Sequence, residues 1–294
     1  MRAHEVPIKT AVTKFVDDVE RRCKSETHRK YKYVMSDFEE RYKDKTVPAI
    51  TVQDLRDYAK SWTLSPSSAR KRIELLRGFF SFCVESKWRD DNPAKSVKPP
   101  LGHASPTAPF SDEEWEKINW ALDQYAELHP QTLPRTQKQI RALVVLLRHS
   151  GLRISDAVSL KRERIDKDGR LFIRAIKNQK PVFLPLPPKV IQAIDEAEEG
   201  NSYIFWSGLG NLKTAVTDWQ GRLQKLCADG GIKGRGFAHR CRANFSVDLL
   251  NEGVPVEMVA TILGNSPRIV ERHYSMFVKS RQISLEAAVK ATWS

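Results

Sequence analysis

The chain has 294 residues, which suggests about two domains, each large enough to form its own hydrophobic core. Its 49 Lys and Arg against 36 Asp and Glu give a formal net charge of +13, which favours a polyanionic partner, either nucleic acid or an anionic membrane surface. The longest aliphatic run, Ala142 to Leu147, is far shorter than the ~20 residues that cross a bilayer, and the N-terminus lacks an apolar signal segment, so we exclude residence in a membrane and expect the cytoplasm.

Hydrophobic spacing predicts four amphipathic helices in the first part of the chain. They are expected over residues 7–24 and 27–42, from Thr51 with Asp54 as a capping box, and from Ser65-Pro66. We therefore predict a small helical domain over residues 1–95. Residues 1–100 hold 22 Lys and Arg against 15 Asp and Glu, so this part is itself basic.

A proline-rich stretch separates this domain from the rest. Residues 92–109 contain five prolines and little periodicity, which is typical of an extended connection, and we place a linker at 96–110. Ser111 caps the first helix of a second domain, residues 111–280, and residues 281–294 form a C-terminal helix. Further helices are expected around 140–147 and at 188–198, 211–229, 239–251, 255–263 with Gly264 as its stop, 267–278 and 283–292.

One small sheet is predicted within the second domain. Residues 171–176 and 181–186 are short segments rich in β-branched and aromatic residues, and they flank a polar stretch that runs from Lys177 to Lys180. This pattern predicts an antiparallel hairpin. The fold class is therefore mainly α with a small β-sheet, an α+β arrangement.

Several scattered residues suit the transfer of a phosphodiester. This reaction spreads negative charge over the non-bridging oxygens, so an enzyme without metal needs fixed cations, a nucleophile and a proton donor. Arg153 follows a glycine turn at a helix N-terminus, where anions bind, and His239 and Arg242 lie three apart on one helix face. Tyr274 is a candidate nucleophile. Taken singly, each residue also fits a structural role as a surface charge or a packed aromatic.

The cysteines do not indicate a metal site. Cys23, Cys83, Cys227 and Cys241 stand far apart, without a C-x-x-C motif or a partnering histidine spacing. We interpret them as reduced thiols and expect neither a zinc site nor a disulfide framework.

The order of the motifs points to a known family. G-L-R-I-S-D at 151–156, a hairpin lysine, H-x-x-R at 239–242, L-G-N at 263–265 and the final tyrosine follow one another in one direction. This series resembles the catalytic domain of tyrosine recombinases of the phage integrase family, the Xer-like and Cre-like site-specific recombinases. The match covers roughly residues 110–280, and the first lobe is similar to the family's helical, SAM-like core-binding domain.

The resemblance implies a role for each motif residue. Arg153 and Arg242 would bind the non-bridging oxygens of the scissile phosphate, and Tyr274 would attack phosphorus to form a 3′-phosphotyrosyl link. Lys177 would protonate the departing 5′ oxygen, with Lys180 as the second choice. His239 would be a general acid/base.

Two further residues complete the set that the resemblance implies. Asp156 would be a structural carboxylate that orients the helix carrying Arg153. Asn265 stands where the family has a histidine or tryptophan that donates to the phosphate; an asparagine amide still donates a hydrogen bond, without charge. The usual H-D-L-R-H reads here as His239 to Ala243, with changes at 240, 241 and 243.

The resemblance also implies partners. We expect double-stranded DNA, held by both domains as a clamp, no cofactor, no metal, and a location at the nucleoid. The protein would be a monomer without DNA and a homotetramer on two DNA sites, with the C-terminal segment docked on a neighbouring subunit or, alternatively, folded back on its own domain. Competing interpretations are a non-catalytic DNA-binding protein on the same scaffold, a type IB topoisomerase, and a helix-turn-helix transcription factor, which would not explain the ordered motifs.

Overall fold

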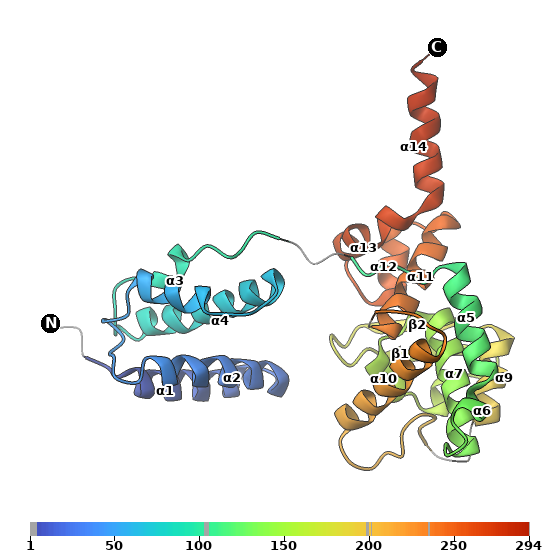
Figure 1. Ribbon diagram of the computed structural model, residues 1–294, viewed down its shortest axis with the longest axis horizontal. Helices are drawn as coiled ribbons and strands as arrows, with labels where there is room; N and C mark the ends of the chain where they lie inside the picture. The colour runs from blue at the N-terminus through green and yellow to red at the C-terminus, as the bar shows by residue number, and fades with distance from the viewer. Residues whose placement is uncertain (1–4, 103–105, 198–199, 201, 235, 294) are drawn as a thin grey trace. The chain divides into compact units, whose positions relative to one another are not determined.

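Two compact units make up the fold (Figure 1). The computed structural model describes residues 5–102, 106–197, 200, 202–234 and 236–293. The chain divides between Ser105 and Pro106, inside the proline-rich stretch. Val97 is buried in the core of the first unit and Phe110 in that of the second.

Unit 1 is a helical domain packed around aromatic rings. Its elements are α1 (Ile8–Arg22), α2 (Ser25–Arg41), α3 (Val52–Lys60), α4 (Pro66–Glu85) and a 3-10 turn, η1 (Pro93–Ser96). Phe15, Phe38, Phe79 and Phe80 are fully buried and meet edge to face, with centroids 5.5 Å apart for Phe15 and Phe79. The four amphipathic helices predicted from the sequence are present, and their apolar faces form this core.

The helix starts follow the predicted capping chemistry. Thr51 and Asp54 form a reciprocal capping box at the start of α3, and Ser111 does the same with Glu114 at the start of α5. The Ser65 hydroxyl accepts the Ser68 backbone N–H, 3.3 Å away, at the start of α4. These local signals lie within four residues of each helix start, which is why the sequence alone could place them.

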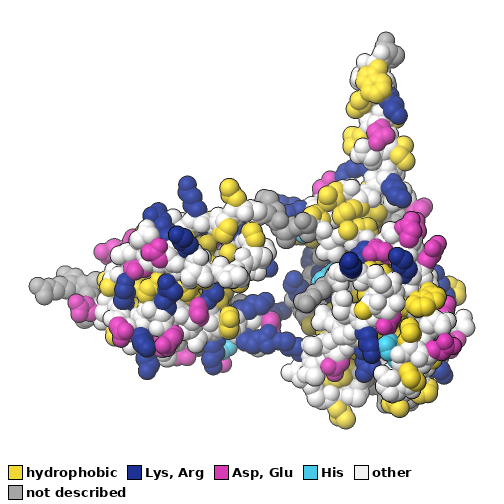
Figure 2. All heavy atoms as spheres, viewed as in Figure 1, with side chains coloured by type: hydrophobic (Ala, Val, Ile, Leu, Met, Phe, Trp, Pro, Cys, Tyr) yellow, Lys and Arg dark blue, Asp and Glu magenta, His cyan; other side chains and the backbone are white. Residues whose placement is uncertain are grey.

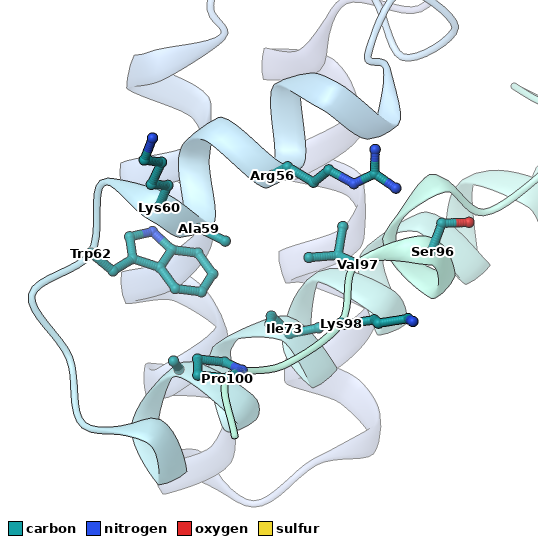
Figure 3. Close-up of a pocket in the computed structure, with 10 residues that line it drawn as sticks. Arg56, Ala59, Lys60, Trp62, Ile73, Ser96, Val97, Lys98 and Pro100 are labelled. Atoms are coloured by element: carbon teal, nitrogen blue, oxygen red, sulfur yellow. The ribbon is translucent and has the colours of Figure 1, made fainter. Parts of the chain in front are cut away.

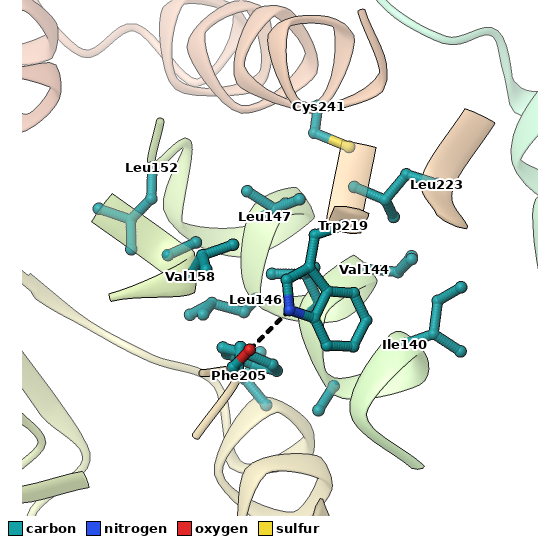
Figure 4. Close-up of a cluster of buried hydrophobic side chains, with 14 of the residues drawn as sticks. Ile140, Val144, Leu146, Leu147, Leu152, Val158, Phe205, Trp219, Leu223 and Cys241 are labelled. Atoms are coloured by element: carbon teal, nitrogen blue, oxygen red, sulfur yellow. Dashed lines mark hydrogen bonds between the residues drawn. The ribbon is translucent and has the colours of Figure 1, made fainter. Parts of the chain in front are cut away.

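Unit 2 is built around the buried helix α7. Its elements are α5 (Asp112–Asp123), α6 (Tyr125–Leu128), α7 (Pro134–Ser150), α8 (Ile154–Val158), η2 (Arg162–Arg164), β1 (Arg170–Arg174), β2 (Pro181–Pro185), α9 (Pro188–Ala197), α10 (Leu212–Asp229), α11 (Phe237–Asn251), α12 (Val256–Leu263), α13 (Pro267–Tyr274), η3 (Ser275–Phe277) and α14 (Lys279–Ala291). Helix α7 packs against α9 and α11. Figure 4 shows its leucines around Trp219, whose Nε1 donates to the Phe205 carbonyl at 2.6 Å.

The predicted hairpin is present, with ends slightly different from those expected. Strands β1 and β2 pair antiparallel with Phe172 opposite Phe183, and the alternating residues Leu171, Ile173, Val182 and Leu184 face the core. The strands were expected to reach residues 176 and 186, but β1 stops at Arg174. Ala175 still donates to the Lys180 carbonyl at 2.9 Å, but the Ile176 N–H turns toward α8 and donates to Asp156.

Two glycines end helices next to each other in space. Gly151 caps α7 with φ +59°, and a Cβ there would lie 2.6 Å from Cδ1 of Phe245, so the position requires glycine. Gly264 caps α12 with φ +60°, as the sequence predicted. The residues that follow these caps, Leu152-Arg153 and Asn265, are thereby directed toward one region of unit 2.

The C-terminal helices differ most from the expected bounds. Helix α13 ends at Tyr274 rather than at 278, since residues 275–277 form a 3-10 turn, and α14 begins at Lys279 rather than 283. No described residue of α14 is buried, and among the described residues its polar contacts with the rest of unit 2 are in its first turn, where Ser280 bonds to Asn251 and Arg281 pairs with Glu271. It projects from the end of unit 2 near α11 and α13 (Figure 1), and Figure 2 shows hydrophobic side chains along it. No helix in the described part of the chain has the length and apolar character needed to cross a membrane.

Candidate active site

The motif residues come together on one side of unit 2 from separate elements. Arg153 stands at the N-cap of α8, His239 and Arg242 lie one turn apart at the start of α11, and Asn265 follows the end of α12. Tyr274 is the last residue of α13. The hydrogen bonds and charge interactions described below connect these five residues.

Arg242 is buried and held by two helix ends. Its Nη1 donates to the Gly151 carbonyl and its Nη2 to the Leu263 carbonyl, both at 2.6 Å. Carbonyls at helix C-termini have no partner within the helix and sit at the negative end of the helix dipole, so they suit a guanidinium. Burial lowers the pKa of Arg242, as does the charge of Arg153, while Tyr274 opposes this through its charge and a side-chain hydrogen bond. The guanidinium is thus fixed beside the tyrosine.

Arg153 lies against Asn265. Its Nη2 donates to Oδ1 of Asn265 at 2.9 Å, and its Nη1 is 4.0 Å from Oδ2 of Asp156. The sequence led us to expect that the Asn265 amide would donate toward a phosphate. The structure shows that the side-chain oxygen accepts from Arg153, an interaction between residues 112 apart that no sequence pattern indicates, while the amide nitrogen is a separate group.

Asp156 connects the arginine to the hairpin. The carboxylate is almost fully buried, and its Oδ1 accepts the backbone N–H of Ile176 at 2.8 Å. Burial raises its pKa, whereas this hydrogen bond and the charges of Arg153 and Arg242 act in the opposite direction. The expected role was to orient the helix that carries Arg153. The structure shows that Asp156 also binds the backbone of Ile176, the residue directly before Lys177.

Tyr274 is packed through its ring. Its side chain is 9% exposed and belongs to a small core that includes Ala243, Val247 and Leu263. The hydroxyl group interacts with Arg242. The ring is therefore held by α11 and α12, while the hydroxyl lies beside the Arg242 guanidinium.

His239 and Lys177 lie at the exposed side of the cluster. Desolvation lowers the pKa of His239, although part of its ring remains exposed, and the charges of Arg242, Arg153 and Lys177 lower it further. The imidazole is therefore mainly neutral at pH 7, in the form that accepts a proton. In the described residues, no three His, Cys, Asp or Glu side chains are grouped as a metal site requires, and side-chain cations provide the positive charge here.

Two further hairpin residues reach the site: Asn178, to which the sequence analysis gave no role, and Lys180. Asn178 donates from Nδ2 to the Gly264 carbonyl at 2.7 Å. Lys180, the second choice for the hairpin lysine, donates from Nζ to the Asn265 carbonyl at 3.0 Å. The sequence feature that could have indicated these contacts is Gly264 as a helix stop, because the carbonyls at a helix end are free to accept hydrogen bonds.

Unit 1 has a basic pocket of its own. Arg56, Lys60 and Lys98 surround a volume of about 490 Å³ beside the indole of Trp62 and the side chain of Val97 (Figure 3). Three exposed cations beside an aromatic face favour an anionic partner with an apolar portion. The basic character predicted for the first domain is therefore present on its surface.

The fold resembles that of known DNA integrases. The structure superposes on a lambda integrase dimer bound to a COC′ core site with a TM-score of 0.74 and 16% identity, covering 94% of this chain and 78% of that one. The Tn1549 transposon integrase in complex with a circular intermediate DNA gives 0.71 and 17%, covering 95% and 99%. At these identities the likeness establishes the fold, which is mainly helical with one small hairpin, as predicted.

Sequence comparison identifies the family. The model of the phage integrase family matches residues 112–277. The chain is 26% identical over 238 residues to tyrosine recombinase XerC of Chlamydia muridarum, covering 76% of this chain and 72% of that protein. It is 27% identical to transposase B of Tn554 from Staphylococcus aureus, over 73% of this chain but 35% of the transposase. The chain belongs to the phage integrase family.

Proposed function

We propose that this protein is a site-specific DNA recombinase that breaks and rejoins DNA through Tyr274. The observation that carries the proposal is the convergence of two arginines, a neutral histidine and a lysine from α8, α11 and the hairpin turn, with the Tyr274 hydroxyl of α13 beside Arg242. Family membership supports the same activity. A non-catalytic protein that had kept this fold only to bind DNA would not need a tyrosine hydroxyl beside a buried guanidinium.

The proposed reaction exchanges one phosphodiester bond for another. Arg153 and Arg242 bind the two non-bridging oxygens, and the Tyr274 oxygen forms a bond to phosphorus while its proton passes to His239. The bond from phosphorus to the 5′ oxygen breaks, and Lys177 gives that oxygen a proton. Reversal by a second 5′ hydroxyl restores the tyrosine and joins the strands, so no external energy source is consumed.

Asp156 and Asn265 have supporting roles in this proposal. Asp156 would fix the position of Arg153 relative to the hairpin, because its carboxylate contacts both. Asn265 would fix the Arg153 guanidinium through its Oδ1. Because that oxygen accepts from Arg153, the amide nitrogen would remain the group with which Asn265 donates to the phosphate.

The proposed partner is double-stranded DNA, bound by several copies of the chain. Both units are basic, and unit 1 adds the pocket of Arg56, Lys60 and Lys98. Ile283, Leu285, Val289 and Trp293 are 53% to 74% exposed on the C-terminal segment, and we propose that this segment docks on a neighbouring subunit. We expect a monomer without DNA and a homotetramer on two sites.

The activity can be tested on DNA that the protein itself selects. Footprinting of purified protein on DNA near its gene defines a site, and a nick placed beside the cleavage position traps the covalent product. We expect cleavage to persist in excess EDTA, because side chains supply the charge that metal ions supply in many nucleases. Cleavage lost on chelation, with binding intact, would refute the proposed mechanism. Covalent cleavage without site preference, with relaxation of any supercoiled DNA, would indicate a topoisomerase instead.

Cleavage should depend on pH through His239. Its pKa lies below the ordinary value of 6.5, so the neutral ring persists into mildly acidic solution. If the neutral ring accepts the Tyr274 proton, the single-turnover rate should be flat near pH 7 and should fall only below pH ~6.5, as the ring becomes protonated. The His239→Gln variant should cleave slowly, and its rate should not show this fall at acidic pH. A rate that falls with a midpoint above 6.5, or an unchanged fall at acidic pH in the variant, would rule out this role.

We expect Asn265 to affect the cleavage rate by holding the Arg153 guanidinium in place. Asn265→Ala removes a hydrogen bond to a charged group, which we expect to raise the activation free energy by ~1.5 to 3 kcal/mol and so to slow cleavage about 10- to 150-fold. Asn265→His, which restores the residue typical of the family, should be active. Melting temperatures measured alongside separate this role from a purely structural one. A less stable Asn265→Ala protein that cleaves at the normal rate would show that the residue only completes the helix cap.

A further inference from the structure

The turn at the end of α12 accepts hydrogen bonds from three side chains in two other parts of unit 2, α11 and the hairpin turn. The carbonyls of Leu263, Gly264 and Asn265 accept, in order, from Arg242 at 2.6 Å, Asn178 at 2.7 Å and Lys180 at 3.0 Å. Three successive backbone oxygens thus join the catalytic arginine of α11 to two residues of the hairpin turn.

The geometry of the helix end explains why these carbonyls are available. Gly264 adopts a left-handed conformation, and the N–H groups of Gly264 and Asn265 turn back to the Thr261 and Ala260 carbonyls at 3.0 and 2.8 Å. The carbonyls that follow point away from the helix, at the negative end of its dipole. Strand β2 packs on α12, and a Cβ at Gly264 would lie only 3.6 Å from that of Lys180. The hairpin therefore lies directly against this helix end.

Lys177 lies between two anchored residues. The Ile176 N–H donates to Asp156 at 2.8 Å, and the Asn178 side chain donates to Gly264. The Asn178 Oδ1 also accepts the Lys180 N–H at 3.4 Å, and Lys180 continues the contact to Asn265. The turn is thus held on both sides of Lys177, whose charge acts on His239.

From these contacts we infer that Asn178 is a positioning residue, which together with Lys180 fastens the hairpin turn to the end of α12 and so places the Lys177 ammonium at the 5′ leaving oxygen. This inference rests on the proposed recombinase function and extends it. It also assigns the two lysines: Lys177 is the proton donor, and Lys180 is a structural donor whose ammonium is bound to the Asn265 carbonyl.

The nature of the leaving group provides a test specific to proton donation. In a substrate with sulfur in place of the bridging 5′ oxygen, the leaving thiol has a pKa near ~8.5, so it departs as a thiolate without a proton donor. Displacement by ~1 Å is enough to cost ~10²-fold in rate, and we expect Asn178→Ala to slow cleavage of the oxygen substrate by about that factor. On the sulfur substrate it should cleave within about twofold of the unmodified protein, as expected for a surface change.

Controls separate this role from general damage to the turn. Gln179 has a φ of +58°, which glycine adopts readily, and its side chain donates to the Ile176 carbonyl within the turn rather than to α12. Gln179→Gly should therefore cleave both substrates within about twofold of the normal rate. Lys177→Ala should lose ~10²-fold or more on oxygen and recover on sulfur, like Asn178→Ala but more strongly.

Conservative variants distinguish the two lysines. An arginine still donates to a carbonyl but is a poor acid, because its pKa exceeds ~12. Lys180→Arg should therefore retain cleavage of the oxygen substrate, and Lys177→Arg should lose it. The opposite pattern would overturn the assignment.

The remaining outcomes are equally decisive. If Asn178→Ala slows both substrates to the same extent, or slows neither, the positioning role is refuted while the proposed function stands. If the unmodified protein forms no covalent complex with either substrate on its own site, the proposed function itself fails.

Discussion

Tyr274→Phe should bind its DNA site with unchanged affinity and form no covalent complex at all. The substitution removes one oxygen, and the ring remains packed against α11 and α12 because the side chain is already part of that core. Without the hydroxyl there is no nucleophile, so the loss should be complete rather than partial. Binding can be measured by gel shift and the covalent product on a nicked substrate by denaturing electrophoresis.

The neighbouring residue offers a matched control. Ser275 also carries a hydroxyl next to this position, but the hydroxyl that interacts with Arg242 is that of Tyr274. Ser275→Ala should therefore form the covalent complex normally. A Tyr274→Phe protein that still links to DNA, or a Ser275→Ala protein that does not, would move the nucleophile away from Tyr274.

Arg242→Ala should lose cleavage by ~10²-fold or more, the scale expected when a fixed donor to a developing charge is removed. It should also lower stability, because the carbonyls of Gly151 and Leu263 lose their donor in a buried place, at ~1 to 3 kcal/mol. Arg242→Lys should also be slow, since one ammonium cannot reach both carbonyls and a phosphate as the planar guanidinium does. Single-turnover cleavage and melting temperature measure the two effects.

Arg240 is the appropriate comparison on the same helix. It donates to the Ala108 and Pro109 carbonyls at 3.2 Å and pairs with Glu114, away from the catalytic cluster. Arg240→Ala should lower the melting temperature and leave cleavage by the folded protein unchanged. If both arginine variants lose cleavage in proportion to their lost stability, the role of Arg242 is structural.

The sequence predicted those parts of the fold that depend on local signals. Thr51, Ser65 and Ser111 mark helix starts by bonds within the next three residues, and Gly264 marks a stop. Strand pairing around residues 171–186 was visible from alternation and turn residues. The end of α13 and the start of α14 were predicted wrongly because residues 268–291 contain no glycine or proline to mark the break between the two helices.

The contacts between the residues of the site could not be predicted in the same way. The contacts of Arg153 with Asn265, Asp156 with Ile176, and Asn178 with Gly264 join residues from 20 to 112 positions apart. Such contacts depend on how helices pack, and the side chains involved carry no local pattern. The order of the motifs indicated which residues belong together, but not that Asn265 would accept from an arginine.

Mapping the covalent bond by mass spectrometry tests the central claim most directly. The protein is trapped on a nicked substrate in EDTA, the complex is digested with protease and nuclease, and the modified peptide is sequenced. We predict a nucleotide attached through its 3′ phosphate to Tyr274, and a free 5′ hydroxyl on the other DNA end. A link to another residue, attachment through a 5′ phosphate, or cleaved DNA without any attached peptide would contradict the account.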